Sequence, residues 1–282
     1  MKSNAGFTLV EMLVAVAVSM IIMAGVYSAF LSQQKNTVVQ TNVSDIQQNL
    51  RAAMDFLARD IRLAGYAGTD SGSLGSFGFT DVGFKNYDTT SNAAGSGFVA
   101  FTWDTDDDGA VGTGDRVSYS LADNSAVPSL SYSMALMRQV GTSARQLMAG
   151  NVINIGLAFA YDADQDGEID RDAAGNVIWA VDTDNDGDWD NLDRNGDGLI
   201  TAADLNSGTT GTIVGTGTGT PLRYSDIRKV RIWLLGRSQA PDSTYTDNNV
   251  YVVGRDVIQP NDNFRHRLLE RIVLCRNLGF NK

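Results

Sequence analysis

Side chains that supply reactive sulfur or imidazole are scarce in this 282-residue sequence. Cys275 is the only cysteine, which excludes a disulfide within the chain. We expect a buried free thiol there, because Cys275 follows apolar Leu274 at the end of a predicted strand; a bridge to another chain is the alternative. His266 is the only histidine, which excludes a zinc site built on several histidines and leaves no convincing nucleophile–base pair. We therefore do not expect an enzyme.

Positive charge is also sparse, and it is unevenly spread. The net charge is −11, and residues 101–206 hold 20 Asp and Glu against 5 Lys and Arg. The rest of the chain holds 13 acidic and 17 basic residues, so it is mildly basic without a dominant basic stripe. This distribution argues against nucleic acid as a partner.

Proline and charge are both nearly absent from the first part of the chain. No proline precedes Pro128, and Glu11 is the only charged residue between positions 7 and 30. An apolar run of this length predicts a membrane-spanning helix. A secretory signal peptide is a poorer interpretation, because the run is too long and no small-residue cleavage site follows it. A plain anchor leaves Glu11 unexplained, since a charge at membrane depth is costly.

The residues around this acid carry a resemblance to a known family. Residues 6–11 read Gly-Phe-Thr-Leu-Val-Glu behind a six-residue leader, residues 1–6. This resembles the class III signal of type IV pilins and of the pseudopilins of type II secretion. The resemblance implies that a prepilin peptidase cuts between Gly6 and Phe7 and that the new Phe7 amine is methylated. It also implies that Glu11 pairs with the N-terminal amine of a neighbouring pilin as a filament grows.

Behind the membrane segment the pattern becomes amphipathic. Apolar residues at 46, 50, 53, 54, 57, 61 and 64 lie on one face of a helix. We therefore predict one helix over residues 7–65, with 7–30 in the membrane and the second half packed on a globular domain. Residues 66–282 form that domain, with the acidic region at 104–206.

The rest of the chain reads mostly as strands joined by turn-rich connections. Strands are predicted at 97–103, 116–121, 130–137, 152–161, 177–181, 227–235, 250–253 and 264–274. Residues 66–97 are predicted as a long surface loop, and the Gly/Thr-rich stretch 207–220 as a flexible loop. The fold class is thus α+β, a long helix against an antiparallel β-rich domain.

The C-terminal part is similar to a narrower group. Residues 227–237 and 265–278 look like the corresponding half of W-type minor pilins (the PilW family) and of the related J-type pseudopilins. The resemblance covers about the first 65 and the last 55 residues. It implies a minor pilin of a type IV pilus, at the initiating tip complex, held in the inner membrane with a periplasmic domain before it reaches the pilus at the cell surface. The alternatives are a type II secretion pseudopilin and a calcium-dependent tip adhesin.

Four segments of the acidic region follow the calcium-binding loop pattern, with oxygen ligands at positions 1, 3 and 5, Gly at 6, a backbone carbonyl at 7 and an acid at 12. The best matches are loop 193–204, with Asp193, Asn195, Asp197, Leu199 and Asp204, and loop 104–115, with Asp104, Asp106, Asp108, Ala110 and Asp115. The weaker matches are loop 162–173, with Asp162, Asp164, Asp166, Glu168 and Asp170, and loop 182–193, with Asp182, Asp184, Asp186 and Asp188.

Two details separate the weaker loops from the stronger ones. Loop 162–173 has Ala173 at position 12, so Asp170 or Asp172 has to close it, and loop 182–193 shares Asp193 with the next loop. Position 8 is apolar in every loop and is predicted to tie it to the core: Val111, Ile169, Trp189 and Ile200. The alternative is that these Asp-Gly segments are solvated turns. We expect Ca²⁺ to stiffen the domain, because unpaired carboxylates at this density repel one another.

Overall fold

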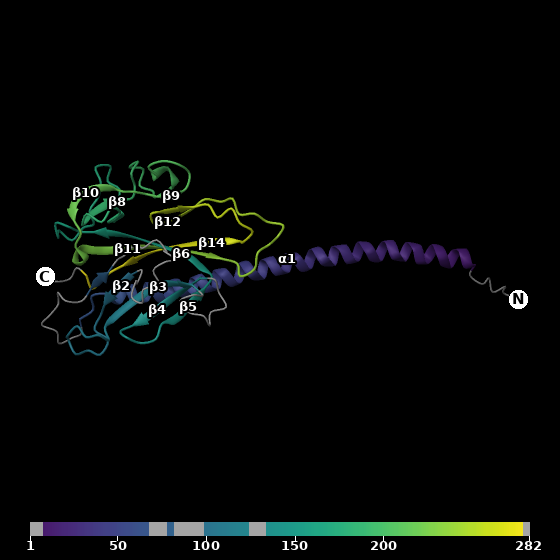
Figure 1. Ribbon diagram of the computed structural model, residues 1–282, viewed down its shortest axis with the longest axis horizontal. Coiled ribbons are helices and arrows are strands. Elements are labelled where there is room, and N and C mark those ends of the chain that lie inside the picture. The colour runs from purple at the N-terminus through teal and green to yellow at the C-terminus, as the bar shows by residue number, and fades with distance from the viewer. Residues whose placement is uncertain (1–7, 68–77, 82–98, 124–133, 279–282) are drawn as a thin grey trace. The chain divides into compact units, whose positions relative to one another are not determined.

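The computed structural model describes residues 8–67, 78–81, 99–123 and 134–278 (Figure 1). The chain divides into two compact units, after Asp45. The regular elements are one α-helix, the strands and two short 3₁₀ helices: α1 (Leu9–Leu63), β1 (Phe79–Asp81), β2 (Val99–Thr102), β3 (Arg116–Asp123), β4 (Met134–Val140), β5 (Gln146–Gly150), β6 (Val152–Tyr161), β7 (Ala180–Val181), β8 (Asp188–Asn191), η1 (Ala202–Asp204), β9 (Gly211–Thr212), β10 (Thr216–Pro221), η2 (Tyr224–Asp226), β11 (Ile227–Arg237), β12 (Tyr251–Val253), β13 (Asp256–Ile258) and β14 (His266–Leu274).

Helix α1 confirms the predicted change of character along its length. Its first part exposes large apolar side chains, from Leu9 to Val38, whereas its second part buries one face. The buried face consists of Ile46, Leu50, Ala53, Met54, Leu57, Ala58, Asp60 and Ile61. The helix ends just before Gly65, whose φ of +80° is the left-handed conformation that commonly terminates helices.

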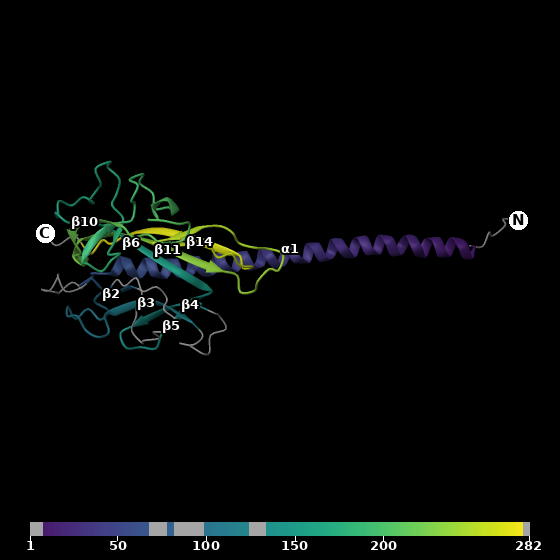
Figure 2. The ribbon, with the colours of Figure 1, turned by 45° about the horizontal axis from the view of Figure 1, so that its top comes forward.

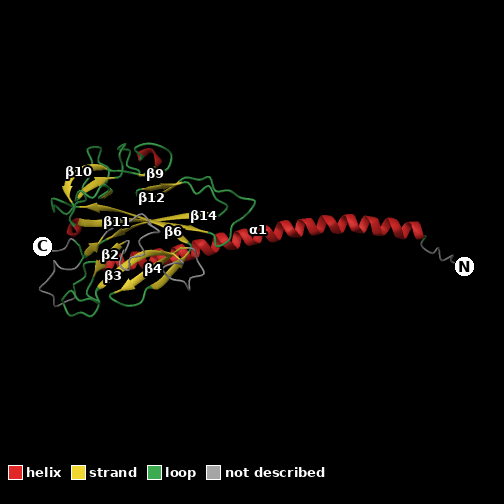
Figure 3. Ribbon diagram, viewed as in Figure 1, coloured by secondary structure: helices red, strands yellow, loops and turns green. Residues whose placement is uncertain are grey.

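The strands form three antiparallel sheets (Figure 3). Strands β1 to β5 follow chain order in a five-stranded sheet, and the six-stranded sheet has the order β10-β8-β7-β6-β11-β14. The third sheet, β12-β13-β9, has three strands. The α+β class predicted from the sequence is therefore confirmed.

The buried half of α1 lies between the two larger sheets (Figure 2). On one side Leu50 is so close to Gly236 of β11 that a Cβ atom there would lie 3.1 Å from the leucine side chain. On the other side Asp60 accepts hydrogen bonds from the Tyr119 hydroxyl of β3 at 2.8 Å and from Arg138 Nε of β4 at 2.6 Å. One continuous cluster of buried residues joins the helix to both sheets.

The three-stranded sheet packs on the other face of the six-stranded sheet. Gly236 of β11 faces α1, and position 233 of the same strand points to the opposite face because side chains alternate along a strand. Gly156 of β6 is paired with Trp233, so it belongs to the face away from the helix. A Cβ atom at Gly156 would lie 2.3 Å from the amide nitrogen of Gly254, beside β12. The two backbones can meet only because Gly156 has no side chain.

Several sequence predictions need correction. The stretch 207–220 is not a flexible loop, because β9 and all of β10 except Pro221 lie within it and β10 pairs with β8. Strands β5, β8 and β13 were not predicted. Residues 97–98 of the strand predicted at 97–103 and residues 130–133 of the strand predicted at 130–137 lie outside the described residues. Of the loop predicted at 66–97, the described part contains β1. The other predicted strands correspond to observed strands, and the range of β6 is confirmed residue by residue.

The buried carboxylate on α1 gives a stability prediction. Asp60→Ala leaves Arg138 and Tyr119 without their acceptor, so we expect a loss of about 3–5 kcal/mol of unfolding free energy. The matched control is Asp55→Ala, earlier on the same helix. Asp55 pairs with Arg271 but its side chain is 72% exposed, so the loss should be at most about 1 kcal/mol. Denaturant unfolding of the full-length chain in detergent measures both. Equal losses would contradict the packing described here.

Candidate metal loops and the N-terminal motif

The N-terminal motif is described only from Thr8 onward, so Gly6 and Phe7 lie outside the described residues. Glu11 belongs to the first turn of α1. Its Oε2 accepts hydrogen bonds from the Thr8 amide at 2.9 Å and the Thr8 hydroxyl at 3.0 Å, and the Thr8 hydroxyl oxygen accepts from the Glu11 amide at 3.3 Å. This reciprocal arrangement is a capping box. The acid therefore has a local structural role that the sequence reasoning had not assigned.

The four acidic loops share one backbone course. In each loop the residues at positions 4 and 6 have positive φ. At position 4 these are Asp107, Gln165, Asn185 and Gly196, and at position 6 they are Gly109, Gly167, Gly187 and Gly198. The positive φ explains the glycine at position 6, because the φ values there, from 71° to 94°, are unfavourable for other residues. Four loops with one conformation are the result of one repeated motif.

A repeated hydrogen-bond pattern accompanies this conformation. The carboxylate at position 1 accepts from the glycine amide at position 6: Asp104 from Gly109, Asp162 from Gly167, Asp182 from Gly187 and Asp193 from Gly198, at 2.7 to 3.3 Å. The acid at position 5 accepts from the amide at position 7: Asp108 from Ala110, Asp166 from Glu168, Asp186 from Asp188 and Asp197 from Leu199, at 2.7 to 2.9 Å. The amides hold the carboxylates along the inside of each turn.

A further acid closes every loop by accepting a hydrogen bond from the amide at position 2. Asp115 and Asp204 do so from position 12, as predicted, at 2.9 Å each. In the other two loops the closing acid stands at position 9, where Asp170 accepts from Ala163 at 3.2 Å and Asp190 accepts from Thr183 at 2.7 Å. Of the two residues considered for loop 162–173, the structure thus selects Asp170.

The loop that begins at Asp182 differs from its prediction. Asp190 closes it, so Asp193 is not shared and serves as position 1 of loop 193–204. Asp190 was not predicted, because the calcium-loop pattern places the closing acid at position 12. The signal was present, since an acid directly follows the apolar residue at position 8 in both Ile169-Asp170 and Trp189-Asp190.

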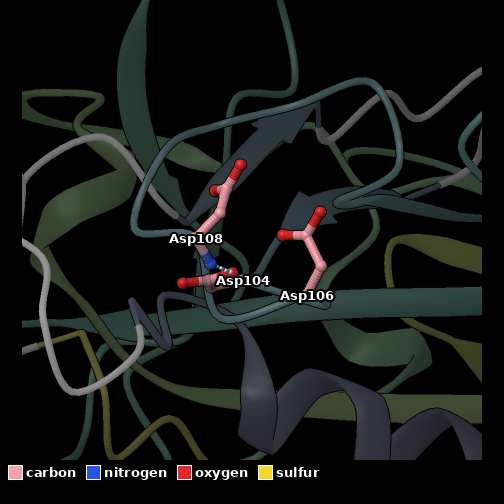
Figure 4. A group of neighbouring side chains, drawn as sticks. All are labelled: Asp104, Asp106 and Asp108. Carbon is pink, nitrogen blue, oxygen red and sulfur yellow. Dashed lines mark hydrogen bonds between the residues drawn. The ribbon is translucent and has the colours of Figure 1, made fainter.

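Three groups of carboxylates converge within the described part of the chain. They are Asp104, Asp106 and Asp108; Asp162, Asp164 and Asp166; and Asp182, Asp184 and Asp190. In each group one oxygen from every residue lies within 4.8 Å of the others. Figure 4 shows the first group, with the Asp108 amide donating to Asp104. The third group contains Asp190 with the predicted Asp182 and Asp184, whereas the predicted Asp186 is not part of it.

Crowding changes the acidity of these groups. Partial desolvation, followed by repulsion from Asp108 and Asp115, raises the pKa of Asp106. Desolvation and the neighbouring Asp186 and Asp190 raise the pKa of Asp184 in the same way. A cation placed among these oxygens would relieve the repulsion.

Loop 193–204, the best match to the sequence pattern, is not among these convergent groups, although Asp193, Asn195, Asp197 and Asp204 share its backbone hydrogen-bond pattern. Asp193 and Asp204 are buried, and Asn195 donates to Asp197 at 3.2 Å. The capping box of η1 fixes Asp204, whose carboxylate accepts from Thr201. The carbonyls at position 7, on Ala110, Glu168, Asp188 and Leu199, stay predicted ligands.

The apolar residues at position 8 tie three of the four loops to the core. Trp189 and Ile200 are buried, and half-buried Ile169 packs against the core. The prediction was wrong for Val111, which is 47% exposed. Loop 104–115 is held instead by its two ends, because β2 and β3 on either side of it are paired in one sheet.

The donor set determines what these loops could bind. All side-chain donors are carboxylate or amide oxygens, which suit hard cations such as Ca²⁺ and Mg²⁺ rather than zinc or copper. Strands flank the loops for the most part, so they are not helix-flanked EF-hands. The oxygen donors of these loops are therefore of the type that binds calcium.

Two models of known protein families match this chain. The model of the prokaryotic N-terminal methylation motif matches residues 1–27, which contain Gly6, Phe7 and Glu11. The model of prepilin peptidase-dependent protein B matches residues 39–246, most of the chain. The chain belongs to the prepilin peptidase-dependent protein B family. Membership in this family confirms the resemblance to type IV pilin-like minor pilins, which are structural proteins. The name of the family indicates processing by prepilin peptidase.

A solved structure is similar to this family member. It is a type IV-like pilin from Thermus thermophilus, 11% identical, with 83% of this chain and 97% of that chain covered and a TM-score of 0.36. No curated protein sequence matches the chain. Helix α1 is long and apolar enough to cross a membrane, which, with the methylation motif, fits membrane anchoring.

The shared loop conformation gives a second prediction. Gly187→Ala places a side chain at φ +89° in open space, so the cost is backbone strain alone, about 1 kcal/mol of unfolding free energy. Asn185→Gly, at position 4 of the same loop, should change stability by less than about 0.5 kcal/mol, because asparagine already tolerates this region. Denaturant unfolding in the presence of a chelator measures both variants. A larger loss for Asn185→Gly would show that the loop conformation is different.

Proposed function

We propose that this protein is a minor pilin that takes part in assembling a type IV pilus, at the initiating tip complex. The observation that carries the proposal is the methylation motif with Glu11 at the head of a charge-poor helix. Family membership supports the pilin-like class and leaves the position in the filament to experiment. The other pilins are the partners, through the first half of α1.

The proposed mechanism follows from the cost of a buried charge. A charged side chain at the bilayer centre costs about 2.5–3.5 kcal/mol even on lenient scales. Thr8 donates two hydrogen bonds to the Glu11 carboxylate, but Thr8 carries no positive charge that could neutralise it. The free amine of a processed Phe7 in a neighbouring subunit would supply one. Pairing inside lipid would then set the register between two helices.

The location follows from the same features. Residues 7–30 would anchor the unassembled protein in the inner membrane, with the β-rich domain in the periplasm. Prepilin peptidase would cut at Gly6–Phe7, and assembly would bring the domain to the pilus and the cell surface. A pseudopilin of a type II secretion system would use the same helix and the same acid.

We also propose that the acidic loops hold Ca²⁺ in the exported domain. In loops 104–115 and 193–204 the residues would be Asp104, Asp106, Asp108 and Asp115, and Asp193, Asn195, Asp197 and Asp204. For loop 104–115 support comes from the converging oxygens of Asp104, Asp106 and Asp108 and from the raised pKa of Asp106. For loop 193–204 it comes from the shared backbone course and hydrogen-bond pattern. The ion would neutralise carboxylates that the buried ends of each loop force together, and so stabilise the folded domain.

Glu11→Gln separates the two roles of this residue. Glutamine still accepts the hydrogen bonds of a capping box, but it has no charge for the neighbour's amine. We expect normal cleavage at Gly6–Phe7 and normal levels of mature protein. Incorporation into sheared pili should fall at least about tenfold, equivalent to about 1.4 kcal/mol of pairing energy.

Met12→Leu, the adjacent position in the same apolar helix, is the matched control and should incorporate normally. The assay is performed in a host that has both pili and a type II secretion system. Normal incorporation of the Glu11→Gln protein would contradict the pairing mechanism. Lost secretion with intact pili would identify a pseudopilin instead.

Calcium binding predicts a change in thermal stability. At calcium about 100 times the dissociation constant, one site adds about 2.7 kcal/mol, enough to raise the midpoint by about 5 °C or more for a domain of this size. The paired change Asp193→Ala and Asp197→Ala should remove part of that increase. Melting of the full-length chain in detergent, with calcium and with chelator, measures it. Identical midpoints would refute the calcium proposal.

A further inference from the structure

One carboxylate oxygen in loop 162–173 is left without a partner. Asp162 follows the last residue of β6 and is 1% exposed. Its Oδ2 accepts from the Gly167 amide at 3.3 Å and from Arg228 Nε at 3.2 Å. Its Oδ1 is buried and has no hydrogen-bond donor among the described residues. A buried acceptor in this state is costly unless something absent from the protein atoms satisfies it.

The surroundings of Asp162 indicate what would satisfy it. Oxygens of Asp162, Asp164 and Asp166 lie within 4.8 Å of one another, and Asp170 closes the loop beside them. Asp164 and Asp166 are exposed, so an ion can reach the group from solvent. An oxygen-only set of this kind suits a hard divalent cation of the calcium class.

Arg228 connects this loop to the C-terminal segment, defined here as residues 275–278. Its Nη1 donates to the Leu278 carbonyl and, at 2.8 Å, to the Ser225 carbonyl, and its own carbonyl accepts from the Cys275 amide at 2.9 Å. Its Nη2 lies 3.2 Å from Asp162 Oδ2. The guanidinium of Arg228 thus joins the acidic loop to the Leu278 end of the segment, and the backbone of the same residue holds the Cys275 end.

The C-terminal segment in turn covers the end of α1. Asn277 Nδ2 donates to the Arg62 carbonyl at 3.0 Å, which satisfies one of the last carbonyls of the helix. The Leu278 side chain lies against Gly65, so close that a Cβ atom there would be 2.5 Å from it. The segment therefore connects the acidic loop to the C-terminal end of α1.

We propose that loop 162–173 binds a divalent cation of the calcium class through the free Oδ1 of Asp162, and that this ion, through Arg228, locks the C-terminal segment against the end of α1. The inference rests on the proposed binding of calcium. The ion takes Oδ1, and Arg228 keeps Oδ2 as an outer partner that orients the ligand. With the ion absent, repulsion from Asp164 and Asp166 displaces the Asp162 carboxylate, and Arg228 loses its fixed acceptor.

Cys275 provides a probe of this lock. It is the only cysteine, it is 2% exposed, and burial raises the pKa of its thiol to about 12. A maleimide can therefore react only when the segment opens, and the labelling rate reports that opening. The experiment uses the full-length chain in detergent, with calcium chloride or with chelator, and reads the rate by mass spectrometry.

The test variant is Asp164→Asn, and the matched control is Asp197→Asn, an exposed position in loop 193–204. In the wild-type chain we expect calcium to slow labelling about tenfold or more. Asp164→Asn should abolish that slowing, whereas Asp197→Asn should keep it. Both changes are on exposed side chains, so both proteins should fold, and circular dichroism checks this.

The outcomes separate this inference from the broader calcium proposal. If equilibrium dialysis finds no bound calcium in the wild-type chain, both fail. If calcium binds and raises the melting midpoint but leaves the labelling of Cys275 unchanged, only the lock is overturned. If Asp197→Asn abolishes the slowing as fully as Asp164→Asn does, the protection is a general effect of stability and the assignment to loop 162–173 is overturned.

Discussion

A single carboxylate in an otherwise uncharged apolar helix is the constraint on which the account of this protein depends. Glu11 is held locally by Thr8, and that capping box explains why the helix begins where it does. It does not explain a full negative charge in a segment suited to lipid, because a neutral residue would cap as well. The methylation motif around Glu11 is the reason for the proposed pairing of this charge with the amine of an adjacent subunit.

The second half of α1 serves a different purpose from the first. Its apolar face, with Asp60 among it, is enclosed by two antiparallel sheets, so helix and domain form one core. The domain has no disulfide to strengthen it, since Cys275 is alone and buried. The domain contains four acidic loops, and the backbone amides of each loop hold its carboxylates in position. Such loops can link strands firmly when a cation balances their charge.

Much of this could be predicted from the sequence, and what could not has physical reasons. The second half of the helix has strong periodicity, β6 is a mostly apolar run, and residues 6–11 form a specific motif. The strands within 207–220 were missed because Gly and Thr give no apolar alternation, although these strands pair with β8 and β13. Asp190 was missed because loop closure depends on the course of the backbone, which brings position 9 to the amide at position 2.

The central claim is that the N-terminus is processed so that Glu11 meets a new amine. The most direct measurement is the intact mass of the mature protein, purified from a host with an active prepilin peptidase. The account predicts a chain that begins at Phe7 and carries one added methyl group. A mature protein that still begins at Met1 would contradict it, and the chain would then be a tethered domain with no role in filament assembly.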